Sequence, residues 1–565
     1  MESSGRFVLA IILMVAVIVV TNLLFPPAPP QPAEQVGPGV EAPATAPATP
    51  QQEAVAGEAA AGTEALAGIT AEPAAPESVA ADTIIVSSPL YRYALTTRGA
   101  ALIGAELLRY ESFTRDGAVE LLPPDVAALL SYELRLDGGV VDLETLDFQV
   151  ETPDTVALQE GDAARTIEFV HRTPQGVAIH IAYTFDPDNY LIDVSGRVEG
   201  LPAGTTPLLA LDLAPTLAIN EANAKEDERS LAFVVRSTRD GVRSVKLDDV
   251  DRERIEEGPL QWVALRNKYF LLATIRAEDE RASDFGGLIA RDIPGQEYAA
   301  DLTATLPIGR DQTFDFRIYA GPQAYERLTA IGYDLGDVNP IGYKIFRPII
   351  RPLAHLVTWA VVGLHRTLDI GYGWVLILFG VLVRLVLWPL NARAGRAQMK
   401  NMALQPRMQE IQQKYKDNPE KLQQEMLRLY REEGFNPFGG CLPMLIPFPV
   451  LITLFFVFQN TIEFRGVEFF WLPDLSRPDP YYILPILLGL SMFGMQRVTM
   501  RVAPANQQAK MLMYIMPAFM VLIFFNLASG LNLYFAAQNV AAIPQQLQLA
   551  KERQRHQEQR QQGRR

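Results

Sequence analysis

The sequence predicts a polytopic α-helical membrane protein of six spans, with a large all-β domain between the first span and the other five. Two observations lead to this prediction. Long apolar segments occur at the start of the chain and again after about residue 370. Between them, residues 83–319 alternate apolar and polar side chains with a period of two, which is typical of half-buried strands. With 565 residues, the chain has room for several domains.

The first apolar segment, Phe7–Phe25, is long enough to span a bilayer and long for a signal peptide. PPAPP follows it without a clear cleavage site, which favours an uncleaved anchor at 1–25 over a cleaved signal. Residues 26–82 are rich in Pro, Ala, Glu and Gln. Because such a segment buries too little apolar surface to order, we expect a disordered linker there.

The β domain is expected at 83–335. In VAIHIAYTF, residues 177–185, every second side chain is apolar, and QTFDFRIYA, residues 312–320, repeats the pattern. Turns rich in Gly, Pro, Asp and Asn separate such runs, which indicates an antiparallel β sandwich. His171 and His180 flank one turn. Since no paired acid or ligand cluster accompanies them in the sequence, we interpret both as exposed strand residues, with His180 on the face opposite the apolar stripe.

A short helix is expected at 323–331. Residues 336–370 mix basic and apolar side chains, and their apolar stretch is too interrupted to cross a bilayer. This pattern favours an amphipathic helix lying at the membrane interface, in contact with lipid, over a further core span.

Five more spans are expected within residues 371–550. They are 371–391, 441–460, 481–497, 511–528 and 530–547. The last two form one apolar run of roughly 55 Å if helical, which is too long for a single crossing. The sequence NLASG, residues 526–530, supplies the break between them.

Basic residues predict the orientation of these spans. The loop after the span 371–391 and the tail 551–565 are basic, whereas the loop 461–480 is acidic overall. With six spans, both termini are then cytoplasmic, and the β domain lies in the periplasm of a bacterium with an inner membrane. The single cysteine, Cys441, excludes an intramolecular disulfide, so the exported domain must depend on its core.

Arg384 is the only charged residue in the middle of the segment 371–391, and the long apolar segments offer no acid to pair with it. A charge inside a bilayer is costly and is usually paired or faces water, so Arg384 predicts a wet cavity at membrane depth. Snorkelling towards the interfacial Trp388, one turn away, is an equally open alternative. Gly380 lies one turn before Arg384 and thins that helix face.

Residues 393–432 predict a cytoplasmic helical hairpin, in which Asn418 caps the second helix and Pro419 occupies its first position. One interpretation is a self-packed helix pair with a solvated charged face. The other adds that flexible methionines contact emerging polypeptide. The candidate contact residues are Met399, Met402, Met408 and Met426.

The hairpin leads into NPFGGCLPMLIPFPV, residues 436–450. With VLVRLVLWPL around Arg384, QPRMQEIQQKY, DPYYILPILLG and SGLNLYF, this run resembles the YidC family of membrane protein insertases in its Gram-negative form. The resemblance covers about residues 340–550. It implies a five-helix insertase core, with a groove open to the cytoplasm and to lipid but closed outside. It also implies a periplasmic β domain similar to a galactose-mutarotase-like supersandwich.

In this resemblance the groove arginine of the family falls on Arg384, and its tyrosine pair falls on Tyr534 and Phe535, so one hydroxyl is missing. Gly380 stands where some members have a polar residue. Further candidates for groove hydrogen bonds, each equally suited to helix packing or a turn, are Gln459, Asn526, Ser529, Asn532 and Gln538. Candidates for an apolar exit path to lipid are Phe455, Phe456, Phe524 and Phe525.

The resemblance implies a non-enzymatic insertase and chaperone that inserts nascent membrane proteins into the inner membrane and helps them fold, alone or with the Sec translocon. The sequence contains no P-loop and no metal cluster, so we expect no nucleotide and no cofactor. The basic tail and the hairpin favour contact with the ribosome. Attraction of the tail to anionic lipid is the competing interpretation.

Two other functions are open to test. A small-solute transporter could bind an anion at Arg384, but the sequence has no inverted repeats and no paired broken helices. A sugar-binding or sugar-converting protein would act through the β domain. It would need a constellation of acids and histidine that the sequence does not assemble.

Overall fold

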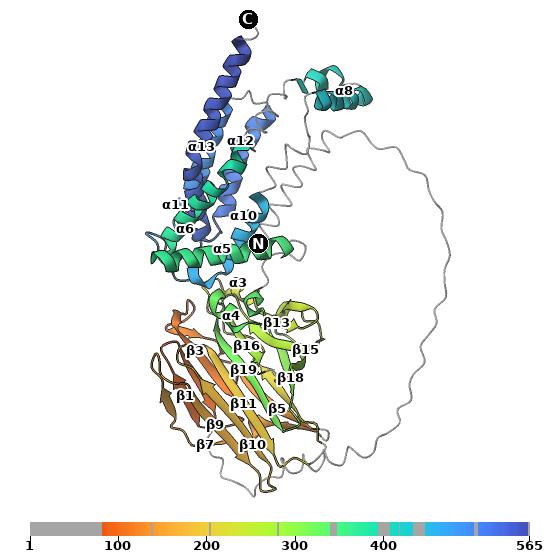
Figure 1. Cartoon of the computed structure of the whole chain (residues 1–565), viewed down its shortest axis with the longest axis vertical. Helices are drawn as coiled ribbons and strands as arrows, with labels where there is room; N and C mark the ends of the chain where they lie inside the picture. The colour runs from red at the N-terminus through yellow and green to blue at the C-terminus, as the bar shows by residue number, and fades with distance from the viewer. Residues whose placement is uncertain are drawn as a thin grey trace, which may run out of the picture. The chain divides into compact units, whose positions relative to one another are not determined.

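The computed structural model describes residues 82–136, 139–202, 205–279, 282–339, 347–393, 407–408, 410–416, 418–432, 447–501 and 507–562. The chain divides into two compact units, which we call the β unit, within Ala48–Pro340, and the helical unit, within Ile341–Arg565 (Figure 1). The predicted anchor at 1–25 and the linker up to residue 81 lie outside the described residues, as do Met399, Met402 and Cys441.

The described part of the β unit contains nineteen strands in two layers, and strand β15 (Glu253–Arg266) belongs to both. The first layer runs β7 (Gln149–Val150), β9 (Arg165–Arg172), β10 (Ala178–Phe185), β11 (Leu191–Glu199), β19 (Thr313–Pro322), β16 (Phe270–Arg276), β15, β13 (Ala232–Ser237) and β14 (Gly241–Lys246). All of these strand pairs are antiparallel.

The second layer runs β15, β17 (Phe285–Asp292), β18 (Ala300–Pro307), β12 (Leu208–Leu213), β5 (Leu130–Leu136), β3 (Leu102–Glu111), β2 (Tyr91–Thr96), β1 (Thr83–Ser87) and β8 (Thr155–Ala157). Strand β4 (Ala118–Glu120) pairs antiparallel with β3, and strand β6 (Gly139–Asp142) pairs antiparallel with β5. The register of β15 shifts between Glu257 and Leu260, where the strand leaves β17 and joins β13. Such a bulge bends a strand from one layer into the other.

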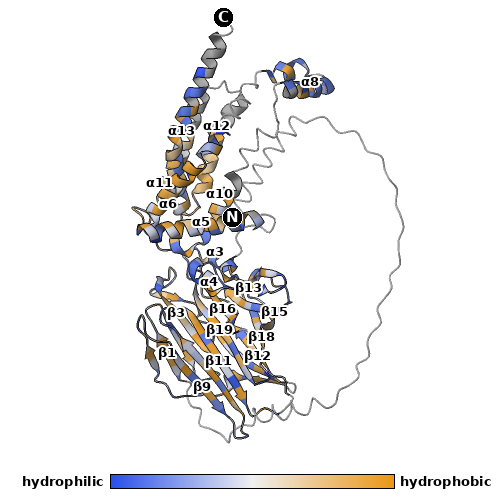
Figure 2. Ribbon diagram, viewed as in Figure 1, coloured by the Kyte–Doolittle hydropathy of each residue, from blue (hydrophilic) through white to orange (hydrophobic). Residues whose placement is uncertain are grey.

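Tyrosines connect the two layers through the core. The Tyr132 hydroxyl on β5 lies 2.7 Å from the Tyr183 hydroxyl on β10, and the Tyr183 hydroxyl donates to the Ala100 carbonyl at 2.6 Å. The Tyr93 hydroxyl on β2 donates to the Ala320 carbonyl on β19 at 2.7 Å. Because buried hydroxyls need partners, these bonds fix how the layers meet. The predicted all-β sandwich is confirmed, and Figure 2 shows its alternating apolar and polar residues.

Short helices complete the β unit. They are α3 (Ala224–Glu228), α4 (Tyr325–Ile331) and the 3-10 turns η1 (Leu143–Thr145), η2 (Leu247–Asp249) and η3 (Leu335–Asp337). The predicted helix at 323–331 is confirmed by α4. Within the predicted helix at 336–370, the structure has the separate turn η3 and then the helix α5 (Arg347–Leu368), while residues 340–346 lie outside the described part.

The described helices of the helical unit are α5 (Arg347–Leu368), α6 (Tyr372–Val386), α8 (Pro419–Glu432), α10 (Pro447–Asn460), α11 (Ile483–Arg501), α12 (Gln507–Phe524) and α13 (Ser529–Gln562), with the 3-10 turn η4 (Ile462–Phe464). Apart from α8, these helices share one apolar core. Within the described residues, none of the helices combines the length and hydropathy expected of a membrane span.

Several predicted boundaries match the helices. Helix α12 ends at Phe524 and α13 begins at Ser529, so the break falls within the predicted segment. The Asn418 side chain accepts a hydrogen bond from the Lys421 backbone N–H at 3.1 Å, which confirms the predicted cap of α8. Helix α13 is longer than expected, because it continues through most of the basic tail to Gln562.

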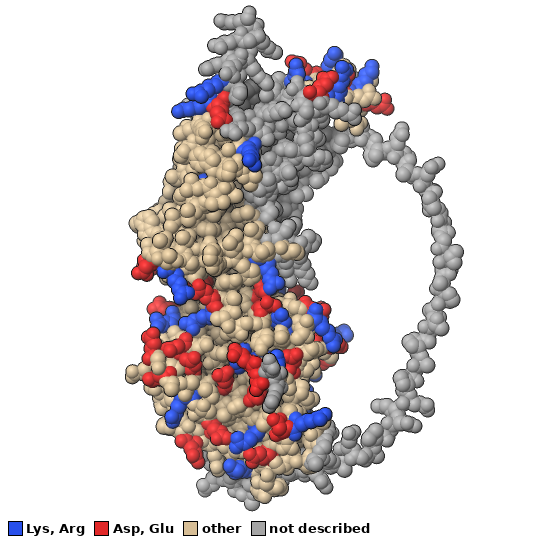
Figure 3. All heavy atoms as spheres, in the orientation of Figure 1, with Lys and Arg blue, Asp and Glu red and all other residues tan. Residues whose placement is uncertain are grey.

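Charge is distributed differently within each unit. Acidic and basic residues are spread over the β unit, whereas the described part of the helical unit presents a broad uncharged face (Figure 3). Helix α5 is amphipathic in burial as well, since Ala354 and Val361 are buried while Leu356 and Trp359 are exposed. An apolar face that remains exposed is a common site of contact with lipid or protein.

Candidate functional site

The candidate site lies where α6 packs against α13. Arg384 stands in the last turn of α6, and its Nη2 donates a hydrogen bond to Gln545 Oε1 on α13 at 2.7 Å. Gln545 is only 2% exposed, and its Nε2 donates to the carbonyl of Trp388, just beyond α6, at 3.0 Å. The amide of Gln545 therefore joins the guanidinium to the backbone that follows α6.

The partner of Arg384 is neutral. Among the residues that the structure describes, Arg384 forms no ion pair, and its buried Nε has no hydrogen-bond partner. Burying a charge without a counter-charge is costly, so such an arrangement is rare unless it serves a purpose. Arg384 was identified from the sequence, whereas Gln545 was missed. A glutamine in a polar stretch near the end of the predicted span 530–547 gives no signal of its own.

Gly380 and Tyr534 lie together at the same interface. A Cβ on Gly380 would lie 3.0 Å from the Tyr534 carbonyl oxygen and 3.3 Å from the Ala537 Cβ, so the glycine allows α6 and α13 to approach closely. The Tyr534 hydroxyl accepts a hydrogen bond from Gln538 Nε2 at 2.6 Å. Gly380, Arg384, Tyr534 and Gln538 thus share one helix–helix interface with Gln545.

An apolar cavity of about 600 Å³ lies beside this interface. Helices α5, α6 and α10 supply most of its lining, and Tyr534 supplies the contribution of α13. Val383 and Leu387, neighbours of Arg384 in the chain, line it, while Arg384 does not. Tyr534 is therefore the residue that belongs to both the polar interface and the apolar cavity.

Two further polar candidates, Ser529 and Asn532, donate to backbone carbonyls. The Ser529 hydroxyl donates to the Asp474 carbonyl at 3.0 Å, and Asn532 Nδ2 donates to the Phe524 carbonyl at 3.1 Å. Both side chains are buried and hold the turn before α13. Asn526 is exposed in that turn, and Gln459 is half-buried on α10.

The four phenylalanines of the predicted exit path pack against aromatic neighbours. Phe455 and Phe524 are buried, while Phe456 and Phe525 are half-buried. The ring centroids of Phe455 and Phe456 lie 5.4 Å apart, and that of Phe525 lies 4.9 Å from Tyr482. In the predicted hairpin, Met408 and Met426 are half-buried.

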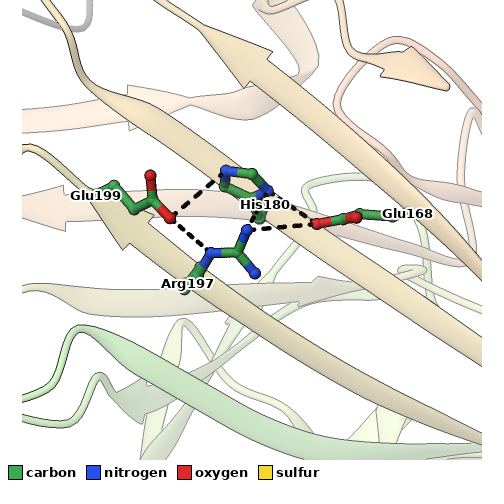
Figure 4. Close-up of polar contacts among 4 residues, drawn as sticks. All are labelled: Glu168, His180, Arg197 and Glu199. Carbon is green, nitrogen blue, oxygen red and sulfur yellow. Dashed lines mark hydrogen bonds and ion pairs between the residues drawn. The ribbon is translucent and has the colours of Figure 1, made fainter.

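The prediction that His180 is exposed and has no paired acid is wrong. His180 on β10 is 4% exposed, and its Nδ1 lies 2.9 Å from Glu168 Oε1 on β9 and 3.1 Å from Arg197 Nη2 on β11 (Figure 4). Glu199 Oε1 lies 3.9 Å from its Nε2. The strand register puts both acids diagonally beside the imidazole, and a single sequence does not reveal that register.

The histidine cluster does not line the cavity of about 510 Å³ that lies in the described part of the β unit. Other residues line that cavity, among them Arg115 and Tyr298. His171, the other histidine at this turn, is half-buried, and its Nδ1 lies 2.8 Å from the Asp147 carbonyl oxygen. The acid and histidine that a sugar site would need therefore lie together, but they do not line this cavity.

The fold defines a protein of two parts, an all-β sandwich followed by a bundle of apolar helices that carries Arg384 at its α6–α13 interface. A model of the 60Kd inner membrane protein family matches residues 363–557, and a model of the YidC periplasmic domain matches residues 83–356. The chain belongs to the YidC family of membrane protein insertases. This membership confirms the family resemblance and the expected periplasmic β domain.

Individual relatives agree with this assignment. The chain is 31% identical to "Membrane protein insertase YidC" of Chlorobaculum tepidum, over 82% of this chain and 81% of that protein. It is 32% identical to the protein of the same name from Chlorobium phaeovibrioides, over 82% of each chain. A solved structure of an active YidC insertase with its first transmembrane domain covers 85% of this chain and 93% of its own, at 18% identity and a TM-score of 0.34.

Proposed function

We propose that this chain inserts nascent membrane proteins into the inner membrane, and that the α6–α13 interface around Arg384 receives the polar part of the substrate. The observation that carries this proposal is the half-buried guanidinium of Arg384, whose Nε is buried and whose described partner is the neutral amide of Gln545. Family membership supplies the class of activity. The charge of Arg384 identifies the place where the polar segment of the substrate would bind.

The physical task of such a protein is to lower the cost of moving a polar segment through hydrocarbon. Each unsatisfied polar group costs several kcal/mol there. A fixed positive charge attracts acidic residues of that segment. The Nε of Arg384, which has no partner among the described residues, offers a further hydrogen bond. Burial of the apolar parts of the substrate, assisted by the membrane potential acting on its acids, is the proposed driving force.

The apolar cavity between α5, α6 and α10 is the proposed binding place for the apolar part of the substrate. Its lining is almost entirely aliphatic or aromatic, as a hydrophobic helix requires. Because Tyr534 belongs to this cavity and accepts from Gln538, it marks the boundary between the polar and apolar parts of the path. Sideways release into lipid past Phe455, Phe456, Phe524 and Phe525 completes this path.

The finer topology is part of the same proposal. We assign six spans, with a five-helix insertase core, cytoplasmic termini and α5 at the interface with lipid. The supports are the apolar segments of the sequence, the basic loops around the core and the exposed apolar residues of α5. The basic residues of the hairpin 393–432 and of the tail 551–565 favour the ribosome as a partner. For larger substrates, the Sec translocon is the proposed partner.

The test uses the purified full-length chain in liposomes and a small two-span substrate made by translation, with protease-protected product as the readout. Arg384→Ala should lower insertion about tenfold or more, while Arg384→Lys keeps most of it, because lysine keeps the positive charge. The matched control is Arg366→Ala, which removes an exposed arginine from α5. Equal insertion by the native chain and Arg384→Ala would refute the proposed role of the charge.

A further inference from the structure

Gln545 uses both ends of its buried amide. The oxygen accepts from Arg384 at 2.7 Å, and the nitrogen donates to the Trp388 carbonyl at 3.0 Å. With 2% of its surface exposed, the side chain has little solvent to replace either bond. A buried amide that is satisfied at both ends is held in one orientation, and it holds its partner in turn. The position of the guanidinium therefore depends on a residue 161 positions further along the chain.

The chemistry of this contact differs from that of an ion pair. An amide oxygen accepts a hydrogen bond without neutralising the cation, so the charge of Arg384 persists. A carboxylate binds a guanidinium more strongly, often through two parallel hydrogen bonds, because both partners are charged. The Nε of Arg384 has no described partner and adds one donor to such a contact. An incoming carboxylate is thus a better partner than the resident amide.

We propose that Gln545 is a neutral placeholder that positions Arg384 between substrates and is displaced by a carboxylate of the incoming segment. This inference rests on the proposed function and deepens it, since it names the residue that holds Arg384 in place until a substrate carboxylate binds. Gln545 is a positioning residue in this scheme. Its amide holds the guanidinium of Arg384 against α13 without neutralising the positive charge.

The decisive variant is Gln545→Glu, which places a permanent carboxylate against Arg384 with almost no change in size. It also removes the donor to the Trp388 carbonyl, a loss that the Gln545→Leu variant shares. We expect Gln545→Glu to lower insertion of a substrate with an acidic translocated segment about tenfold, because the resident acid competes with the substrate acid. The same substrate with its acids changed to neutral amides should insert as it does with the native chain. A merely structural role would lower both substrates together.

The controls use the same helix and the same liposomes. Gln548→Glu adds an exposed acid three residues further along α13 and should leave both substrates unchanged. Gln545→Leu removes the amide without adding a charge, so insertion of the acidic substrate should remain well above that of Gln545→Glu. Circular dichroism and thermal unfolding of each purified variant identify any that fail to fold.

The outcomes separate this inference from the proposed function. If Arg384→Ala abolishes insertion but Gln545→Glu inserts the acidic substrate normally, the placeholder role is wrong and the arginine role remains. If Gln545→Glu and Gln545→Leu lower both substrates equally, Gln545 only supports packing, and the inference is again refuted. If Arg384→Ala has no effect while the native chain inserts, the proposed function of the site fails first.

Discussion

The two units hold cations of low exposure in different surroundings. In the described part of the β unit, Arg317 lies 2.7 Å from Glu278 and Lys268 lies 3.1 Å from Glu226. The buried Arg266 instead donates to the Asn267 carbonyl at 3.3 Å and forms no ion pair within the described residues.

In the helical unit, Arg384 has a neutral amide as its described partner. Pairing compensates for the desolvation of a charge, so Arg317 and Lys268 follow the rule for stable folding. Arg384 differs from Arg266 in its surroundings, because it lies at a helix–helix interface beside an apolar cavity. That position is the reason we propose that its charge is available to a substrate.

The strongest way to test this difference is to break a buried acid site in the β unit and ask whether insertion survives. Asp227 is fully buried, and its two carboxylate oxygens accept from the backbone N–H groups of Asn220 and Lys268, each at 3.1 Å. Asp227→Ala leaves both donors unsatisfied, so we expect a loss of about 3 kcal/mol of stability in the β unit. Insertion by the fraction that remains folded should not change.

The unfolding measurement can be made selective in the full-length protein. Trp262 is the tryptophan of the β unit, so its fluorescence reports urea unfolding once the other four tryptophans are phenylalanine. Asp248→Ala, at an exposed carboxylate of η2, is the matched control and should leave the urea midpoint unchanged. Loss of insertion in proportion to the loss of stability would mean that the β unit takes part in insertion, against our assignment.

A second test concerns how closely α6 and α13 approach. Gly380→Leu places side-chain atoms against the Tyr534 backbone, where even a Cβ would lie 3.0 Å from the carbonyl oxygen. Overpacking of this kind typically costs about 1–3 kcal/mol, and it moves Arg384 away from Gln545. We expect lower thermal stability in detergent and weaker insertion. Gly494→Leu on α11 is the control, since a Cβ there meets nothing within 4 Å. Normal insertion by Gly380→Leu would argue against a site at this interface.

A feature could be predicted from the sequence when the residues that produce it are close together in the chain. The alternation in residues 177–185, the cap at Asn418 and the break before Ser529 are local patterns, and each was recovered in the structure. The His180 cluster depends on the register of three strands, and the Arg384–Gln545 contact joins two distant helices. A sequence lists the residues that take part in such contacts. It does not give the packing that selects one partner among many.

The smallest expected effect is a gain of stability in the β unit. Burial raises the pKa of Asp212 to about 6, although the Thr303 hydroxyl donates to its carboxylate at 2.6 Å. The ordinary pKa is 3.8, so the folded chain binds more protons than the unfolded chain between these values. Stability contributed by this group therefore falls as the pH rises from about 4 to 6, and the penalty is complete above pH 6. Asp212→Asn removes the charge and should raise stability at pH 7 by about 2 kcal/mol.

The pH dependence distinguishes this explanation from a simple packing effect. With the same Trp262 fluorescence, the gain of Asp212→Asn over the native chain should be full at pH 7 and should disappear below about pH 4, where the native carboxyl is protonated in both states. Asp248→Asn, at an exposed site, should show no gain at either pH. A gain that stays constant from pH 4 to 7 would show that ionisation of Asp212 is not its cause. In that case the half-buried carboxylate of Asp212 would, like the half-buried Arg384, lie without an ion-pair partner in the described residues at no measurable cost from its charge.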